Sequence, residues 1–293
     1  MALIESGRQC PGALGAALFT VGAVVLLLAG PAFAAGPDID LCRYRQSFAE
    51  DFHGLSVSSR GEHASRWVAH TPWNGDFGEA AFADPEPGFP FKTNGGVLSI
   101  EARKAADGKW RSGLLASANA EIPGGTNPPH FIQLFGYFEI RAKLPAGPGL
   151  WPAFWLSTAQ PAGATEPSVE IDILEHYGQF PGDFHSVLHI WDRSGADRNK
   201  MEDKVTSVTP GSLYDAFHTY GADVESDLIT FYFDRHEIWQ IPRPPEYQKP
   251  VLVLLDLALG GGWPIDRTPN PSVMEVDYVR IYQRETDGGT QCP

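Results

Sequence analysis

The chain has 293 residues, 43% of them hydrophobic, and carries 22 Lys and Arg against 36 Asp and Glu, a formal net charge of −14. A surface this acidic argues against nucleic acids and anionic membranes as partners, because both repel it, and it fits a neutral substrate more easily. The 31 glycines and 25 prolines follow no repeat, so they indicate many turns rather than collagen or disorder.

The first 35 residues differ from the rest. Arg8 precedes an uncharged stretch with an apolar centre at residues 23–28, and Ala32-Phe-Ala34 matches a small-residue cleavage pattern. We therefore predict a secretory signal peptide over residues 1–35 and a mature protein that is extracellular or periplasmic, with no membrane association after cleavage. An uncleaved membrane anchor is the alternative, because Glu5 weakens the positive character of the leader.

Two cysteines remain in the mature chain, Cys42 and Cys292, one near each end. An even pair in an exported protein predicts a disulfide. Neither cysteine has a Cys or His neighbour at metal-ligand spacing, so the alternative is two free thiols.

Beyond residue 40 the sequence consists of short β-branched and aromatic runs separated by turn residues. This pattern predicts an all-β sandwich of two antiparallel sheets. Because no linker or repeat divides it, we expect residues 36–293 to form a single domain, and a monomer. The predicted strands are Val97–Arg103, Leu114–Glu121, Phe131–Lys143, Trp151–Ser157, Ser168–His176, His185–Trp191, Phe217–Val224, Ile229–Phe233, Glu237–Ile241, Pro250–Leu259 and Val273–Gln283.

A long charged segment, Arg193–Ser212, is predicted as a loop. It either borders a cleft or is simply solvated.

One predicted strand carries three carboxylates, Glu170, Asp172 and Glu175. On a regular strand the first two share a face and Glu175 lies on the opposite one. A β-bulge at Ile173–Leu174 returns Glu175 to the first face, with Ile171 and one of the two bulge residues facing the core.

Three carboxylates on one face disfavour each other's ionisation. A retaining glycosidase uses such a set: one carboxylate attacks the sugar, while a second, with a raised pKa, protonates the leaving oxygen. The structural alternative is a solvated acidic edge strand, which the flanking apolar residues disfavour.

The run Glu170-Ile-Asp-Ile-Leu-Glu175 resembles the E-x-D-x-x-E motif of glycoside hydrolase family 16, the laminarinase-like β-glucanases. The resemblance implies a concanavalin-like β-jelly roll with an open concave cleft, a polysaccharide partner and no organic cofactor. It extends over roughly residues 45–283, through companion motifs in the same order: Phe135–Pro145, Gly149–Leu156, Phe217–Gly221, Leu259–Pro264 and Met274–Tyr282.

By this resemblance Glu170 is the nucleophile, Glu175 the acid/base and Asp172 the residue that tunes the pair. The bulged spacing is similar to that of the laminarinase, agarase and carrageenase side of the family, and speaks against the lichenases and xyloglucan transferases.

Four further residues are predicted to bind substrate. Trp151 and Trp155 share one strand face, and flat aromatic rings suit the apolar faces of sugars. Trp263 lies on a glycine-rich loop, and His189 matches a histidine on the strand after the catalytic one. Their structural alternatives are core tryptophans, a loop anchor and a core histidine.

One aspartate agrees with the family pattern and another departs from it. Asp277 matches a position that holds a structural Ca²⁺ in several family members, so a Ca²⁺ site is expected there, on the weak basis of a single carboxylate. Asp256 is a departure, because the family pattern usually has Asn before the glycine-rich loop.

The sequence therefore predicts a secreted retaining endo-β-glycosidase. The stretches Trp73–Gly78 and Phe82–Pro85 resemble bacterial exopolysaccharide glycanases. Its expected substrate is thus a β-1,3- or mixed-linkage β-1,3/1,4-glucan, or a β-glucosyl-containing exopolysaccharide. The alternatives are a transglycosylase with the same residues and a non-catalytic glycan-binding module.

Overall fold

The computed structural model describes residues 36–60, 65–73, 75–119, 130–161 and 163–285. All of them belong to one compact unit, Ala35–Pro293. The predicted signal peptide lies outside the described residues. Cys42 is disulfide-bonded. Its predicted partner, Cys292, also lies outside the described residues.

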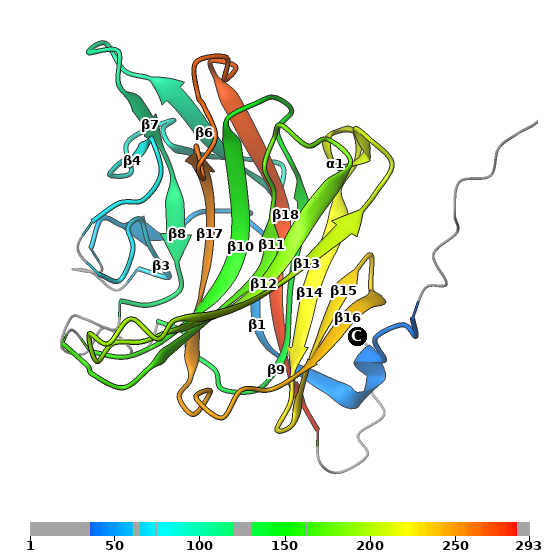
Figure 1. Cartoon of the computed structure of the whole chain (residues 1–293). Coiled ribbons are helices and arrows are strands. Elements are labelled where there is room, and N and C mark those ends of the chain that lie inside the picture. Colours follow the sequence, from blue (N-terminus) through cyan, green and yellow to red (C-terminus); the bar gives the residue numbers. More distant parts are fainter. Residues whose placement is uncertain (1–35, 61–64, 74, 120–129, 162, 286–293) are drawn as a thin grey trace, which may run out of the picture. The chain divides into compact units, whose positions relative to one another are not determined.

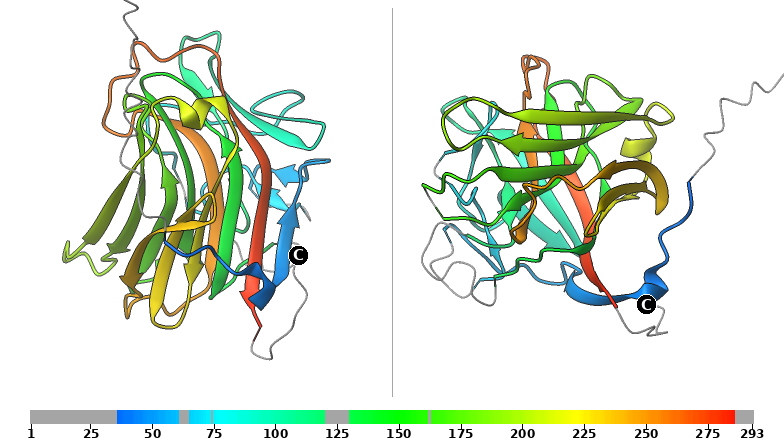
Figure 2. Two further views of the ribbon diagram at one scale, coloured as in Figure 1. Left: turned by 90° about the vertical axis from the view of Figure 1, so that its right-hand side faces the viewer. Right: turned by 60° about the horizontal axis from the view of Figure 1, so that its bottom comes forward.

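The described residues form two β-sheets, which stack as two layers in Figures 1 and 2. The fold prediction is confirmed. The ten-stranded sheet has the order β16-β15-β14-β9-β18-β6-β7-β4, with β1 against β18 and β5 against β6. Its strands are β1 (Tyr44–Glu50), β4 (Ala81–Phe82), β5 (Phe91–Asn94), β6 (Val97–Lys104), β7 (Trp110–Ser112), β9 (Gly136–Lys143), β14 (His218–Val224), β15 (Leu228–Phe233), β16 (His236–Pro242) and β18 (Ser272–Arg284).

The eight-stranded sheet has the order β13-β12-β11-β10-β17-β8-β3-β2. Its strands are β2 (Val57–Ser58), β3 (Trp67–Val68), β8 (Leu114–Ala116), β10 (Leu150–Thr158), β11 (Ser168–Glu175), β12 (Asp183–Trp191), β13 (Lys200–Ser207) and β17 (Val251–Leu259). The short helices η1 (Leu41–Arg43) and α1 (Ser212–Asp215) complete the described elements.

The main hydrophobic core contains buried side chains from both sheets. Phe138 and Ile140 of β9 are fully buried in it, as are Phe154 and Leu156 of β10. Side chains of a strand alternate between its two faces, so the residues between them point away from this core. On β10 that other face is the one that presents Trp151 and Trp155.

The predicted strand pattern was wrong in several details, and strands β1 to β5 and β7 were not predicted. β13 occupies the middle of Arg193–Ser212, which was predicted as a loop, and it pairs with β12 from Ile190↔Lys200 to Asp183↔Ser207. It is an edge strand exposed on both faces, so it lacks the apolar alternation by which strands are recognised. The β2–β3 and β4–β7 pairs are parallel rather than antiparallel.

Within the described part of the chain, no helix has the length and apolar character needed to cross a membrane.

Candidate active site

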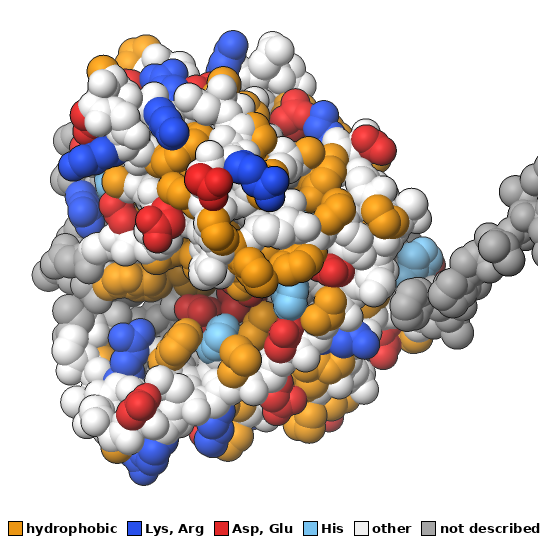
Figure 3. Space-filling model, turned by 45° about the horizontal axis from the view of Figure 1, so that its top comes forward, with side chains coloured by type: hydrophobic (Ala, Val, Ile, Leu, Met, Phe, Trp, Pro, Cys, Tyr) orange, Lys and Arg blue, Asp and Glu red, His pale blue; other side chains and the backbone are white. Residues whose placement is uncertain are grey.

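A cavity of about 510 Å³ opens on the face of the eight-stranded sheet that points away from the main core. Figure 3 shows this hollow, with acidic side chains at its floor and histidine and hydrophobic side chains around it. The carboxylates of Glu170, Asp172 and Glu175 line it, as predicted for one face. Aromatic side chains from four segments surround them: Trp73, Phe77, Trp151, Trp155, Tyr177 and Trp191.

The predicted β-bulge in β11 is present. Leu174 of β11 pairs with Phe154 of β10, and Asp172 of β11 pairs with Trp155 of β10. Ile173 is therefore the extra residue. The β11–β12 ladder shifts register at the same place. The expectation that one bulge residue faces the core was too narrow, because Ile173 and Leu174 are both buried in it; two successive residues of a bulge oppose one partner and both turn to the same side.

Glu175 lies opposite Ala153 on β10 and His185 on β12. Its Oε1 accepts hydrogen bonds from Trp151 Nε1 at 2.7 Å and from the Tyr177 hydroxyl at 2.8 Å. Burial raises the pKa of Glu175 above its ordinary value, and these two hydrogen bonds, which favour the carboxylate, partly oppose that rise.

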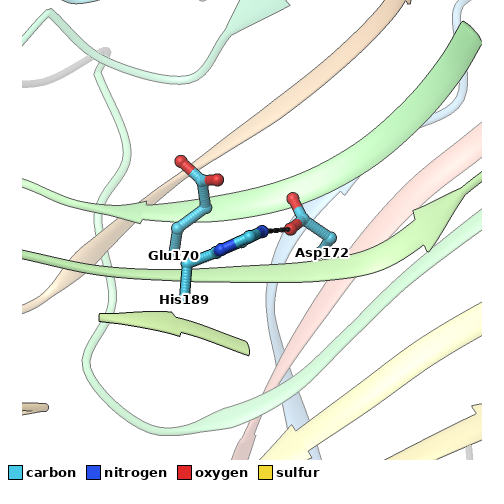
Figure 4. A group of neighbouring side chains, drawn as sticks. All are labelled: Glu170, Asp172 and His189. Atoms are coloured by element: carbon cyan, nitrogen blue, oxygen red, sulfur yellow. Dashed lines mark ion pairs between the residues drawn. The ribbon is translucent and has the colours of Figure 1, made fainter. Parts of the chain in front are cut away.

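Glu170 and Asp172 lie beside His189 of β12. Their carboxylate oxygens and a ring nitrogen of His189 are all within 4.8 Å of one another. In Figure 4 the imidazole of His189 extends towards Asp172, and its Nε2 is 3.4 Å from Asp172 Oδ2. The ring is also stacked on Trp191, at 4.8 Å between centroids. His189 therefore lies beside the carboxyls of β11, and its role in substrate binding stays a prediction.

Burial and mutual repulsion govern the ionisation of these carboxyls. Burial raises the pKa of Glu170 to about 7; a hydrogen bond from Trp191 lowers it and the charge of Glu175 raises it. Burial also raises the pKa of Asp172 well above its ordinary value, and the charges of Glu170 and Glu175 add to that rise. All three carboxyls therefore have pKa values above their ordinary values.

Trp151 and Trp155 both line the cavity, and their role in substrate binding stays a prediction. Trp151 is partly exposed and stacks on Tyr177, with 6.1 Å between ring centroids. Gly261 lies against both rings: a Cβ there would come within 2.7 Å of Tyr177 and 2.9 Å of Trp151. Trp155 is only 5% exposed and donates its indole N–H to Asp256. The two indoles thus differ, one available to a ligand and one largely in the cavity floor.

Trp263 is not among the residues that line the cavity. It lies on the loop after β17, 40% exposed, and packs edge-on against Phe180 at 5.0 Å between centroids. Its role in substrate binding stays a prediction.

Asp277 lies in β18 and pairs with Arg141 at 2.6 Å. A single carboxylate that already holds a guanidinium does not by itself fit a Ca²⁺ ion, which takes six to eight oxygen ligands. Ca²⁺ binding here stays a prediction, and we derive no step of the reaction from it.

Several cavity residues were not among the predicted site residues. Tyr177 and His185 flank Glu175, and Met201 and Asp203 come from β13. His185 Nδ1 lies 3.0 Å from Asp203 Oδ1, so β13 contributes a charged partner to the cavity wall. The sequence could have indicated Tyr177, because it follows Glu175 by two residues. The sequence of β13 has no apolar alternation that would have indicated Met201 or Asp203.

Residues 93–280 match the family model of glycosyl hydrolases family 16. The chain is 30% identical over 265 residues to the endo-1,3-1,4-beta-glycanase ExsH of Rhizobium meliloti, covering 83% of this chain and 52% of that protein. It is 29% identical over 210 residues to a beta-glucanase of Rhodothermus marinus, covering 66% of this chain and 70% of the relative. The chain thus spans about half the length of the first of these relatives.

Among solved structures, the chain resembles the catalytic domain of an endo-1,3-beta-glucanase (laminarinase) from Thermotoga petrophila. The TM-score is 0.64 at 21% sequence identity, covering 83% of this chain and 99% of that one. At this identity the likeness supports the fold.

Proposed function

Because the chain belongs to family 16 of the glycosyl hydrolases, we propose that it is a retaining endo-β-glucanase whose catalytic groups are Glu170, Asp172 and Glu175. One observation carries the proposal: the bulge in β11 brings all three carboxyls to one aromatic-lined cavity. A non-catalytic glycan-binding module has no need of such a buried, mutually repelling set.

In the proposed reaction, the carboxylate of Glu170, which forms as the pH rises past its pKa of about 7, attacks the anomeric carbon of the sugar. Glu175, protonated because burial raises its pKa, donates its proton to the departing glycosidic oxygen. A covalent glycosyl–enzyme results. Glu175, now a carboxylate, then takes a proton from water, which attacks the anomeric carbon and releases Glu170.

Asp172 and His189 assist the two glutamates in both steps. Asp172 lies between Glu170 and Glu175 on the bulged strand, and the charges of both glutamates raise its pKa, so the three carboxyls do not ionise independently. His189, next to Asp172, restricts the position of that carboxyl. Trp151 fixes Glu175 through its indole N–H and offers part of its ring to the sugar.

We propose a β-1,3- or mixed-linkage β-1,3/1,4-glucan as the substrate, or a bacterial exopolysaccharide that contains β-glucosyl units. Support comes from the endo-1,3-1,4-beta-glycanase and beta-glucanase relatives and from Trp73 and Phe77, which lie in a sequence stretch similar to exopolysaccharide glycanases and line the cavity. Export and a monomeric state remain part of the proposal.

The test is chemical rescue of Glu170→Ala. We expect turnover of a β-glucan to fall by roughly a thousandfold or more. Azide should restore cleavage of an activated β-glycoside, with an α-glycosyl azide as the product. The wild type should release the β-anomer first, as followed by NMR before mutarotation. Initial release of the α-anomer would contradict retention, and products longer than the substrate would reveal transglycosylation.

A further inference from the structure

Asp256 lies in β17 beneath the cleft and is fully buried. Its Oδ1 accepts a hydrogen bond from Trp155 Nε1 at 2.9 Å, and its Oδ2 accepts one from the backbone N–H of Ala258 at 3.1 Å. Both donors are neutral. The residues opposite it on the flanking strands, Ala153 on β10 and Leu114 on β8, are neutral as well.

A cross-strand row connects this carboxyl to the catalytic strand. Ala153 pairs with Asp256 on one side and with Glu175 on the other. Two strand spacings place the Cα atoms of Asp256 and Glu175 about 10 Å apart. The titratable groups that face Asp256 from β11, and those beyond them on β12 and β13, are Glu170, Asp172, Glu175, His185, His189 and Asp203.

Asp256 is electrostatically coupled to the carboxyls of β11. Burial raises the pKa of Asp256 to about 7, and the charges of Glu175 and Glu170 contribute to the rise. The charge of Asp256 in turn helps to raise the pKa of Asp172. Asp256 is therefore neutral in acid and becomes an additional negative charge beside the cluster near neutral pH.

We propose that Asp256 is a positioning residue for the proposed glycosidase reaction, which as a carboxylate keeps the Glu175 proton in place to higher pH and holds the Trp155 indole in the cavity floor. This inference rests on the proposed function. An asparagine at this position presents one acceptor and one donor. Its amide nitrogen would face the N–H of either Trp155 or Ala258, so one of these donors would lose an acceptor oxygen.

The test is the pH profile of kcat/KM for Asp256→Asn. We expect its alkaline limb to move to lower pH by about 0.3 to 1 unit, the effect of removing one charge at about 10 Å. The acid limb, which reports Glu170 with a pKa of about 7, does not enter the test, because Asp256 titrates over the same pH range. An alkaline limb that does not move in the folded variant would overturn the proposal.

Asp223→Asn is the matched control. Asp223 is also a buried aspartate, 6% exposed, and accepts a hydrogen bond from the Tyr44 hydroxyl at 2.7 Å, but it lies on β14 of the other sheet. Both limbs of its profile should match those of the wild type.

A second measurement needs no folded Asp256 variant and no glucan. The indole N–H signal of Trp155, assigned with Trp155→Phe, should titrate in the wild-type NMR spectrum with a midpoint near the pKa of about 7 of Asp256. A signal that stays constant from pH 5 to 9 would overturn the proposal. Full activity of Glu170→Ala would refute the proposed function. The Trp155 titration is measured in the wild type, so failure of the proposed function and failure of the Asp256 proposal are distinguishable.

Discussion

Each sheet of this protein buries carboxylates, but it treats them differently. On the ten-stranded sheet, Glu139 is fully buried and accepts hydrogen bonds from the Tyr137 and Tyr278 hydroxyls at 2.8 and 2.9 Å. Arg235 adds a bidentate ion pair, with nitrogen–oxygen distances of 2.9 and 3.0 Å. Charge and hydrogen-bonding capacity are both satisfied there.

On the eight-stranded sheet the buried carboxyls face each other instead. Glu175 receives two hydrogen bonds from neutral donors, and burial and mutual repulsion raise the pKa values of Glu170, Asp172 and Asp256. A buried charge with a matched cation holds a structure together, whereas buried like charges hold protons that chemistry can use. We therefore expect the first cluster to contribute to stability and the second to the proposed reaction.

The largest expected effect is that of Glu175→Ala. Loss of the proton donor should slow cleavage of a β-glucan by roughly 10²- to 10⁴-fold. The melting temperature at pH 7 should not fall in proportion, because the substitution removes one of several carboxyls that repel each other. Substrates with good leaving groups should retain their first step, as measured by burst kinetics. A large loss of stability with unchanged activity would reverse the assignment of the two clusters.

Arg235→Ala tests the other cluster. It leaves Glu139 buried without its guanidinium, and we expect unfolding to become easier by about 2–3 kcal/mol, below the usual range for a buried pair because Arg235 is 40% exposed. The kcat of the folded fraction should match the wild type. Arg141→Ala, which removes an ion pair that is exposed on both sides, is the control and should cost less than about 1 kcal/mol in denaturant unfolding.

Because folding raises the pKa of Glu170, the stability of the protein should fall as the pH rises. Glu170 ionises at its ordinary value of 4.5 in the unfolded chain and at about 7 in the folded protein. Its contribution to stability is complete below pH 4.5 and is lost as the pH rises towards 7. Glu170→Gln should therefore gain stability relative to the wild type over this range.

The size of that gain should be roughly 2 kcal/mol, since the cavity leaves Glu170 partly exposed to water. Melting curves of both proteins from pH 4 to 8 measure it. A difference between them that is constant with pH would show that Glu170 is not held protonated by burial.

The smallest effect is expected for Tyr177→Phe. The Tyr177 hydroxyl donates to Glu175 at 2.8 Å and lowers its pKa. Without it, the alkaline limb of kcat/KM should move up by about half a pH unit, the equivalent of one modest hydrogen bond. This direction is opposite to that expected for Asp256→Asn. A downward shift would contradict the described hydrogen bond.

Local sequence determined much of the catalytic strand. The alternation of side chains placed Glu170 and Asp172 on one face, and their spacing from Glu175 required the bulge at Ile173 that the structure contains. These features depend on the strand's own geometry, which repeats every two residues whatever the neighbouring strands are.

Only the tertiary structure decided what surrounds that strand. Strand pairing brings Asp256 of β17 and Asp203 of β13 to the two sides of the cluster, and loop residues Trp73 and Phe77 to its rim. The polar sequence of β13 contains no apolar alternation, because an exposed edge strand buries neither face; backbone pairing with β12 holds it instead. The sequence therefore determined which residues we propose to react. The order of the strands in the sheet decided which charges those residues face, because pairing between strands far apart in the chain is set by the packing of the whole sheet.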